Sequence, residues 1–182
     1  ARVRVVRLLR NVGQQRAVLF GLSAARGVHI VVMDADLQDD PAVVPVLLER
    51  ARRGADAVFA TRTGRYESVP RLLTSRAFKR LLTSLTGLPL NAGMFFVISA
   101  DVARRIATLQ TATPYLVFMA ANAAERVDSV GTERAARTMG SSAYTSLARL
   151  RVALAALRCV AEVRLGVSRA PVPPAIERST GW

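Results

Sequence analysis

The apolar positions in the first sixty residues alternate between strand-like and helix-like spacing. Residues 3–9 have the pattern of a short strand, and apolar side chains recur at helical spacing over 14–26. The run VHIVVM at 28–33 is unbroken and rich in β-branched residues, which is typical of a strand covered on both faces. A helix over 41–54 and a strand over 56–61 follow. This alternation predicts an α/β fold with a mostly parallel sheet flanked by helices.

The pattern is looser in the rest of the chain. It predicts helices over 71–86, 102–109 and 113–124, strands over 94–99 and within 126–137, and a long arginine-dotted helix over 144–165. We therefore divide the chain into an α/β domain over 1–143, a basic amphipathic helix over 144–166, and a Pro-rich segment over 167–182 that we expect to be disordered.

Composition indicates a globular domain with a strongly basic surface. Hydrophobic residues make up 51% of the 182 residues, which is enough to build a core, but aromatic residues make up only 5%. The core must therefore consist mainly of Val, Leu and Ala. The 26 basic residues outnumber the 13 acidic ones, and the resulting net charge of +13 favours anionic partners. No uncharged run approaches the ~18 residues that a membrane-spanning helix needs.

Acidic residues gather where the most apolar segment ends, in MDADLQDDP at 33–41. Asp34 and Asp36 lie at the carboxyl end of a predicted strand, which is where ligands bind in parallel α/β sheets. Two carboxylates at this spacing can converge on one Mg²⁺ or Mn²⁺ that bridges to the phosphate oxygens of a ligand. The alternative is that they solvate a turn. We interpret Asp39 and Asp40 as caps of the helix that begins at Pro41.

Several short segments, taken together, resemble family 2 glycosyltransferases. They are NVG at 11–13, VVMDADLQDDP at 31–41, ATRTGR at 60–65, GMFF at 93–96 and RTMGSSAYT at 137–145. The chain most resembles the polyprenyl-phosphate branch, which includes dolichyl-phosphate mannose synthases and bacterial undecaprenyl-phosphate sugar transferases. The resemblance implies a GT-A fold and transfer of a sugar from a nucleotide-sugar donor to a polyprenyl phosphate.

The resemblance also implies roles for individual residues. Asp36 would be the main ligand of a divalent ion on the donor diphosphate, with Asp34 nearby and Gln38 in the donor site. Asn11 and Gly13 would lie on the donor side as well. The acceptor phosphate would meet the loop that carries Arg137, Ser141, Ser142 and Tyr144. Arg62 and Arg65 follow a predicted strand end, so they could face the same site as Asp34.

Two features depart from the family pattern. The opening segments V-I-P-x-Y-N-E and D-D-x-S, which hold the nucleotide base and ribose, do not occur, so we expect the chain to begin just before the third strand of the fold. At 91–94 the chain reads NAGM, where many relatives carry an acidic residue, so no catalytic base is evident. A polyprenyl phosphate is already an anion near neutral pH and can attack without a base, which agrees with such an acceptor.

Two further functions are open alternatives. The chain could be a truncated, inactive glycosyltransferase-like scaffold, or its charge could serve nucleic-acid binding. Sparse aromatic residues and the acidic cluster argue against a nucleic-acid partner. We expect a cytoplasmic protein that associates peripherally with the anionic inner face of the membrane. One basic helix face that could lie on anionic lipid is formed by Arg71, Arg76, Lys79 and Arg80.

Overall fold

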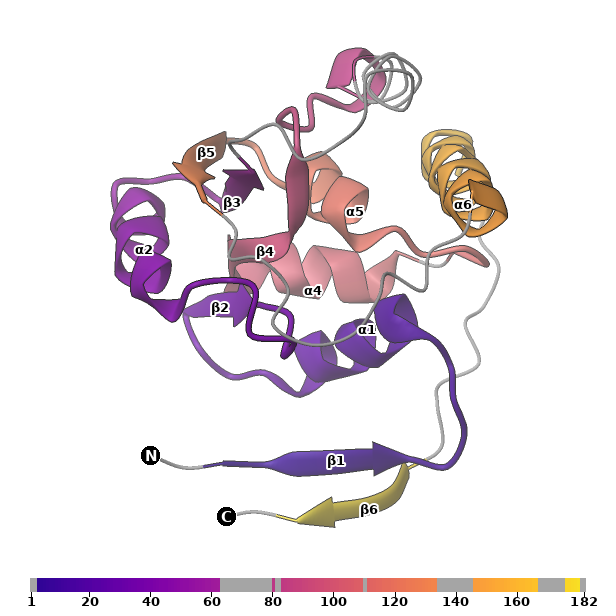
Figure 1. Cartoon of the computed structure of the whole chain (residues 1–182). Helices are drawn as coiled ribbons and strands as arrows, with labels where there is room; N and C mark the ends of the chain where they lie inside the picture. Colours follow the sequence, from indigo (N-terminus) through magenta and orange to yellow (C-terminus); the bar gives the residue numbers. More distant parts are fainter. Residues whose placement is uncertain are drawn as a thin grey trace.

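A four-stranded mixed sheet forms the centre of the molecule in the computed structural model (Figure 1). The structure describes residues 3–62, 80, 83–109, 111–133, 146–166 and 176–180. The strands of the sheet lie in the order β2-β4-β3-β5, with bounds His29–Val32, Ala92–Ser99, Ala57–Arg62 and Val127–Thr132 respectively. The helices are α1 (Gln14–Ala24), the 3₁₀ helix η1 (Pro41–Val43), α2 (Val44–Arg52), α4 (Ala100–Thr108), α5 (Leu116–Ala123) and α6 (Ser146–Arg164).

The strand directions are mixed because β4 is inserted between β2 and β3. β4 runs antiparallel to both of these neighbours, whereas β3 and β5 are parallel. β2, β3 and β5 therefore point the same way, as the predicted α/β alternation requires. No pattern in the sequence indicated that β2 and β3 would be separated, because the strand that separates them comes later in the chain.

Alternate side chains of β4 enter two different halves of the core. Phe95 and Val97 pack on the α2 side, where Leu47 is fully buried. Phe96 and Ile98 face the opposite side, which is covered by α4 and α5 (Figure 1). This period of two is the geometry of an extended strand. It explains why the central strand is apolar at every one of these positions.

Local side-chain chemistry sets the starts of two helices. The Asp40 carboxylate accepts a hydrogen bond from the Ala42 backbone N–H at 2.9 Å, with Pro41 in the first position of η1. The predicted capping role of Asp40 is therefore confirmed, while that of Asp39 stays a prediction. Ser99 accepts from the Val102 N–H at 3.2 Å and begins α4 in the same way.

The strand expected at 3–9 forms, but it lies outside the main sheet. β1 (Val5–Leu8) pairs antiparallel with β6 (Ile176–Thr180), and the two-stranded sheet lies apart from the core on the far side of α1 (Figure 1). The expectation of a disordered tail is wrong for 176–180. Pairing gives the backbone N–H and C=O groups of both segments hydrogen-bonding partners, which local composition does not reveal.

Most of the helix predicted over 71–86 lies outside the described residues. Arg80 and 83–86 are helical, and Arg80 is exposed. Arg71, Arg76 and Lys79 are not described, so the basic face that we expected on this helix stays a prediction.

A carboxylate on α6 holds this helix against the connection between α4 and α5. The side chain of Glu162 is 10% exposed. It accepts hydrogen bonds from the Thr111 hydroxyl at 2.5 Å, the Ala112 N–H at 3.0 Å and Arg158 Nε at 2.9 Å. One turn earlier, Cys159 is fully buried in the core. Apolar contact and a satisfied polar network therefore act together to place α6.

This network changes the acidity of Glu162. The hydrogen bond from Thr111 lowers the pKa of the carboxyl most, and the contacts with Arg158 and the Ala112 N–H act in the same direction. Burial opposes them, but the pKa still lies below the ordinary glutamate value. The ionised form is therefore stabilised by folding.

We expect Glu162→Gln to lower the free energy of unfolding by about 1–3 kcal/mol near neutral pH, because it removes the charge that three donors share. Since the pKa is lowered in the folded state, the stabilisation is present above the unfolded pKa of about 4.3 and is lost as the pH falls through the folded-state pKa. Urea denaturation of both proteins between about pH 3 and pH 7 measures this. The difference should be constant above about pH 5 and shrink below it.

The exposed pair of Glu49 with Arg53 provides the matched control, since the Glu49 side chain is 59% exposed. Glu49→Gln should change the free energy of unfolding by less than about 0.5 kcal/mol. An undiminished effect of Glu162→Gln at the lowest pH would contradict a role for the carboxylate charge.

Candidate active site

The acidic turn emerges directly from the carboxyl end of β2. Val32 is the last residue of the strand and is buried, Asp34 is partly buried, and Asp36 is exposed. The two carboxylates therefore leave the sheet at the edge where ligands of α/β proteins bind. Both carboxylates thus follow the end of a strand as predicted, while their role in binding a ligand stays a prediction.

The first turn of α1 contacts this acidic turn. Gln14 Nε2 donates a hydrogen bond to Asp34 Oδ1 at 2.7 Å. Gly13 precedes the helix with φ of 80°, a conformation that glycine adopts without strain, and its N–H donates to Asn11 Oδ1 at 2.9 Å. Asn11 and Gly13 thus form the start of the helix, and the next residue, Gln14, contacts Asp34. The predicted donor-site residues Asn11, Gly13 and Asp34 therefore lie in one region.

Asp36 and Gln38 are joined by a tight turn. The Gln38 N–H donates to Asp36 Oδ1 at 3.2 Å. Leu37 between them has a positive φ of 59°, and its side chain is 84% exposed. A leucine in this conformation is uncommon and marks a turn whose shape is imposed by its surroundings.

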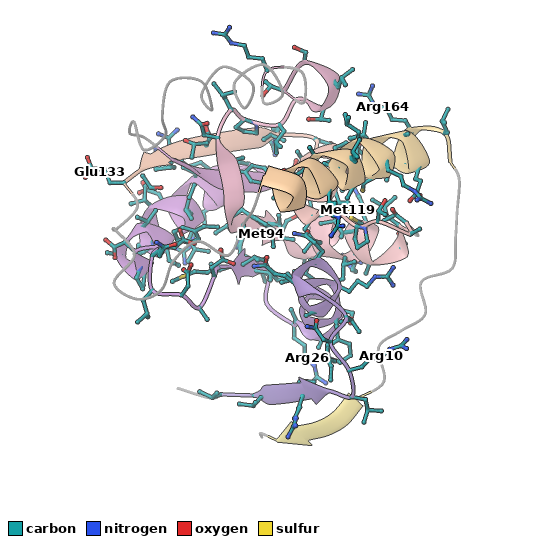
Figure 2. The ribbon with its side chains drawn as sticks, turned by 45° about the vertical axis from the view of Figure 1, so that its right-hand side comes forward. Arg10, Arg26, Met94, Met119, Glu133 and Arg164 are labelled. Atoms are coloured by element: carbon teal, nitrogen blue, oxygen red, sulfur yellow. The ribbon has the colours of Figure 1, made fainter. Side chains whose placement is uncertain are left out.

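Two neighbours of Gln14 were not singled out by the sequence analysis. Gln15 donates to Met94 Sδ at 3.7 Å and accepts from the Leu116 N–H at 2.8 Å. Arg16 donates to the Ala112 carbonyl at 2.8 Å. Figure 2 labels Met94 at the end of β4 that lies next to α1. The sequence pattern that could have pointed to these residues is the run of three polar residues, QQR, at a helix start. The groups that these side chains contact are distant in the chain, so the pattern does not reveal them.

Arg62 lies at the same edge of the sheet as the acidic turn. It is the last residue of β3, which runs in the direction of β2, and its backbone pairs with Thr132 of β5. The turn before β4 reaches this edge too and contains Asn91 with φ of 64°. The side chain of Arg62 is not described. The predicted site residues Arg65, Arg137, Ser141, Ser142 and Tyr144 lie outside the described residues.

The chemistry of Asp34 and Asp36 fits a hard divalent cation. Carboxylate oxygens are preferred ligands of Mg²⁺ and Mn²⁺, and such ions commonly take only one or two carboxylates from the protein and the remaining ligands from phosphate and water. Within the described ranges, no group of three or more His, Cys, Asp and Glu side chains is arranged to hold a metal ion. These two carboxylates therefore suit an ion that a ligand phosphate helps to hold.

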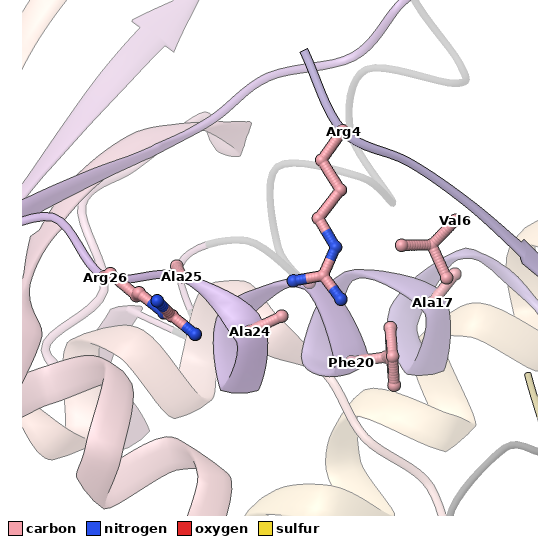
Figure 3. A pocket seen from close by; sticks show the side chains of 8 residues that line it. Arg4, Val6, Ala17, Phe20, Ala24, Ala25 and Arg26 are labelled. Atoms are coloured by element: carbon pink, nitrogen blue, oxygen red, sulfur yellow. The ribbon is translucent and has the colours of Figure 1, made fainter. Parts of the chain in front are cut away.

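A pocket of about 380 Å³ lies elsewhere, between β1 and α1 (Figure 3). Its wall is mostly apolar, with the guanidinium groups of Arg4 and Arg26 beside it. None of the acidic residues lines it.

The buried thiol of Cys159 is unsuited to act as a nucleophile, because burial raises its pKa and so favours the unreactive protonated form.

Comparison with known proteins identifies the family. Residues 1–111 match the model of glycosyl transferase family 2. The chain belongs to this family. The crystal structure of glucosyl-3-phosphoglycerate synthase from Mycobacterium tuberculosis, in complex with Mn²⁺, UDP-glucose and glycerol 3-phosphate, has a similar fold. It superposes with a TM-score of 0.56 and 21% sequence identity, covering 82% of this chain and 55% of that one. The predicted GT-A type of α/β fold is thereby confirmed.

Curated relatives of this glycosyltransferase chain are longer than the chain itself. The uncharacterized glycosyltransferase YkcC of Bacillus subtilis is 34% identical over 118 residues, which is 63% of this chain and 36% of the relative. The undecaprenyl-phosphate 4-deoxy-4-formamido-L-arabinose transferase of Pseudomonas aeruginosa is 27% identical over 155 residues, which is 84% of this chain and 46% of the relative. The chain thus spans less than half the length of these two relatives.

Proposed function

We propose that this chain is part of a glycosyltransferase that moves a sugar from a nucleotide-sugar to a polyprenyl phosphate at a membrane surface with the help of a divalent metal ion. The observation that carries the proposal is the pair of carboxylates, Asp34 and Asp36, at the carboxyl end of β2 in a family 2 glycosyltransferase fold. Support also comes from the names of relatives that act on undecaprenyl phosphate, and from the Mn²⁺ and UDP-glucose bound to the protein of similar fold.

The donor side is assigned to the acidic turn and its neighbours. Asp36 and Asp34 would hold Mg²⁺ or Mn²⁺, and such an ion, when bound, neutralises the negative charge that develops on the leaving diphosphate. The residues proposed to surround the donor are Asn11, Gly13, Gln38, Arg62 and Arg65. Arginines near the diphosphate would add to the positive potential of the site.

The acceptor side is assigned to the loop that contains Arg137, Ser141, Ser142 and Tyr144. A guanidinium group and hydroxyls are well suited to bind and orient a phosphate. An oxygen of the polyprenyl phosphate would form the new bond to the anomeric carbon of the sugar while the bond from that carbon to the nucleoside diphosphate breaks. The diphosphate leaves with the electron pair. Because the attacking oxygen carries no proton, no general base is needed.

Membrane contact is assigned to the outer face of α6. Arg151, Leu154 and Arg158 are exposed on α6 and follow one another at helical spacing, so they form a single stripe, and exposed Leu165 directly follows the last residue of the helix. Leu154 is 57% exposed and Leu165 is 76% exposed. Guanidinium groups beside exposed leucines are typical of helices that lie in an anionic membrane interface. Across the described ranges, no helix is both long and apolar enough to span a bilayer.

The metal assignment predicts that Mn²⁺ strengthens the binding of UDP. Asp36→Asn should reduce the gain in UDP affinity that Mn²⁺ produces by about tenfold or more, because a carboxylate ligand is lost. Calorimetric titration of UDP with and without Mn²⁺ measures it. Asp101→Asn, at an exposed carboxylate of α4 that pairs with Arg104, is the matched control and should bind like the wild type. Equal UDP affinity with and without Mn²⁺ in all three proteins would refute the donor site.

The acceptor assignment predicts that Arg137→Ala reduces sugar transfer by tens-fold or more, since loss of a charged contact typically costs about 2–5 kcal/mol. Donor binding should be nearly unchanged, because the two phosphates occupy different subsites. The assay is transfer of labelled sugar into a lipid fraction by a form extended with the family's two opening segments. Arg104→Ala on α4 controls for loss of a surface arginine. Unimpaired transfer by Arg137→Ala would remove the acceptor assignment.

The membrane assignment predicts that Leu154→Asp combined with Leu165→Asp reduces flotation with vesicles of anionic lipid severalfold at low salt, because apolar burial is lost and negative charge is added. Val28→Asp is the control, since Val28 is 77% exposed and lies before β2, outside α6. Binding that is insensitive to the α6 substitutions would show that another surface meets the lipid.

A further inference from the structure

The orientation of Asp34 is not determined by the sheet. β2 ends at Val32, so Asp34 lies beyond the last paired residue of the strand. A carboxylate on such a connection has rotamer freedom unless a neighbouring group holds it. The hydrogen bond of 2.7 Å from Gln14 Nε2 to Asp34 Oδ1 is a contact that can hold it in place.

The place of Gln14 itself is fixed by its two neighbours in the chain. Gln15 is bonded to Leu116 at the start of α5 and to Met94 in β4, and Arg16 is bonded to the Ala112 carbonyl. These partners belong to two segments that are distant from α1 in the chain, namely β4 and the stretch 112–116 that leads into α5. The first turn of α1 is therefore anchored independently of Asp34, so it can act as a rigid support for the carboxylate.

We infer that Gln14 is a positioning residue that holds the Asp34 carboxylate in the orientation in which it meets a divalent ion. The inference rests on the proposed function, which assigns the ion to Asp34 and Asp36. Groups that hydrogen-bond a metal-binding carboxylate orient it and raise metal affinity, and their loss typically weakens binding about 10- to 100-fold.

A glutamine amide suits this role better than a charged donor. It donates a hydrogen bond without carrying a positive charge, so it does not repel a cation at the same carboxylate. A glutamate at this position would keep the length of the side chain but would place a second carboxylate against Asp34. The role of Gln14 is therefore specific to its neutral N–H donor.

Mn²⁺ binding to the present chain, followed by the loss of the electron paramagnetic resonance signal of free Mn²⁺, tests the inference without any assay of activity. Gln14→Leu should weaken Mn²⁺ affinity by about tenfold. Ser23→Ala, at the other end of α1, is the control and should match the wild type. The thermal midpoint of Gln14→Leu should stay within about 2 °C of the wild type, because Gln14 is exposed.

A double substitution shows whether Gln14 affects Mn²⁺ binding through Asp34 or through a general change in the structure. In an Asp34→Asn background that retains Asp36, Gln14→Leu should change Mn²⁺ affinity by less than about twofold, because the carboxylate that it orients is gone. A tenfold loss that persists in this background, or a Gln14→Leu protein that binds Mn²⁺ as tightly as the wild type, would overturn the inference.

Asp36→Asn distinguishes this failure from failure of the proposed function. If Asp36→Asn weakens Mn²⁺ binding and Gln14→Leu does not, the metal site stands and only the role of Gln14 is wrong. If neither Asp36→Asn nor Asp34→Asn changes Mn²⁺ affinity, the proposed metal site is wrong and the inference falls with it.

Discussion

The pairing of β4 with both β2 and β3 is the constraint on which the rest of the structure depends. Phe96 lies opposite Val32 on one side and Phe59 on the other, so this residue aligns the two neighbouring strands. Phe59 and Phe96 are fully buried, with ring centroids 5.5 Å apart. Because β2 and β3 are aligned in the same direction, their carboxyl ends emerge at one edge of the sheet. The acidic turn, the end of β3 and the turn before β4 meet there.

A second constraint on the structure is a set of hydrogen bonds that connects α1, the segment between α4 and α5, and α6. Ala112 accepts a hydrogen bond from Arg16 through its carbonyl and donates one to Glu162 through its N–H. Helices from opposite parts of the chain are thus joined at one residue. Hydrogen-bonded networks of this kind are stabilising only when each donor and acceptor in them has a partner. This requirement restricts the network to one well-defined geometry. The same helix α1 that enters this network also supports the carboxylate of Asp34.

Three of the four carboxylates in the acidic turn have a distinct structural use, in a chain whose net charge is +13. Asp40 caps η1, Asp36 closes a turn with the Gln38 N–H, and Asp34 accepts from Gln14. Away from this turn, Asp56 accepts from the Glu125 and Arg126 N–H groups and so joins the starts of β3 and β5. The crowded acidic turn is therefore several separately bonded carboxylates, and two of them fit a metal ion.

The sequence by itself determined the types of the strands and helices around the main sheet, the family and the position of the acidic turn, because these depend on periodicity, helix capping and a continuous motif within a few residues. The Asp40 cap and the apolar strand before Asp34 are examples. Only the tertiary structure decided the insertion of β4, the pairing of β1 with β6, and the contact of Gln14 with Asp34. Each joins segments that are distant in the chain, and their free energies come from packing and hydrogen bonds that exist only once those segments are brought together.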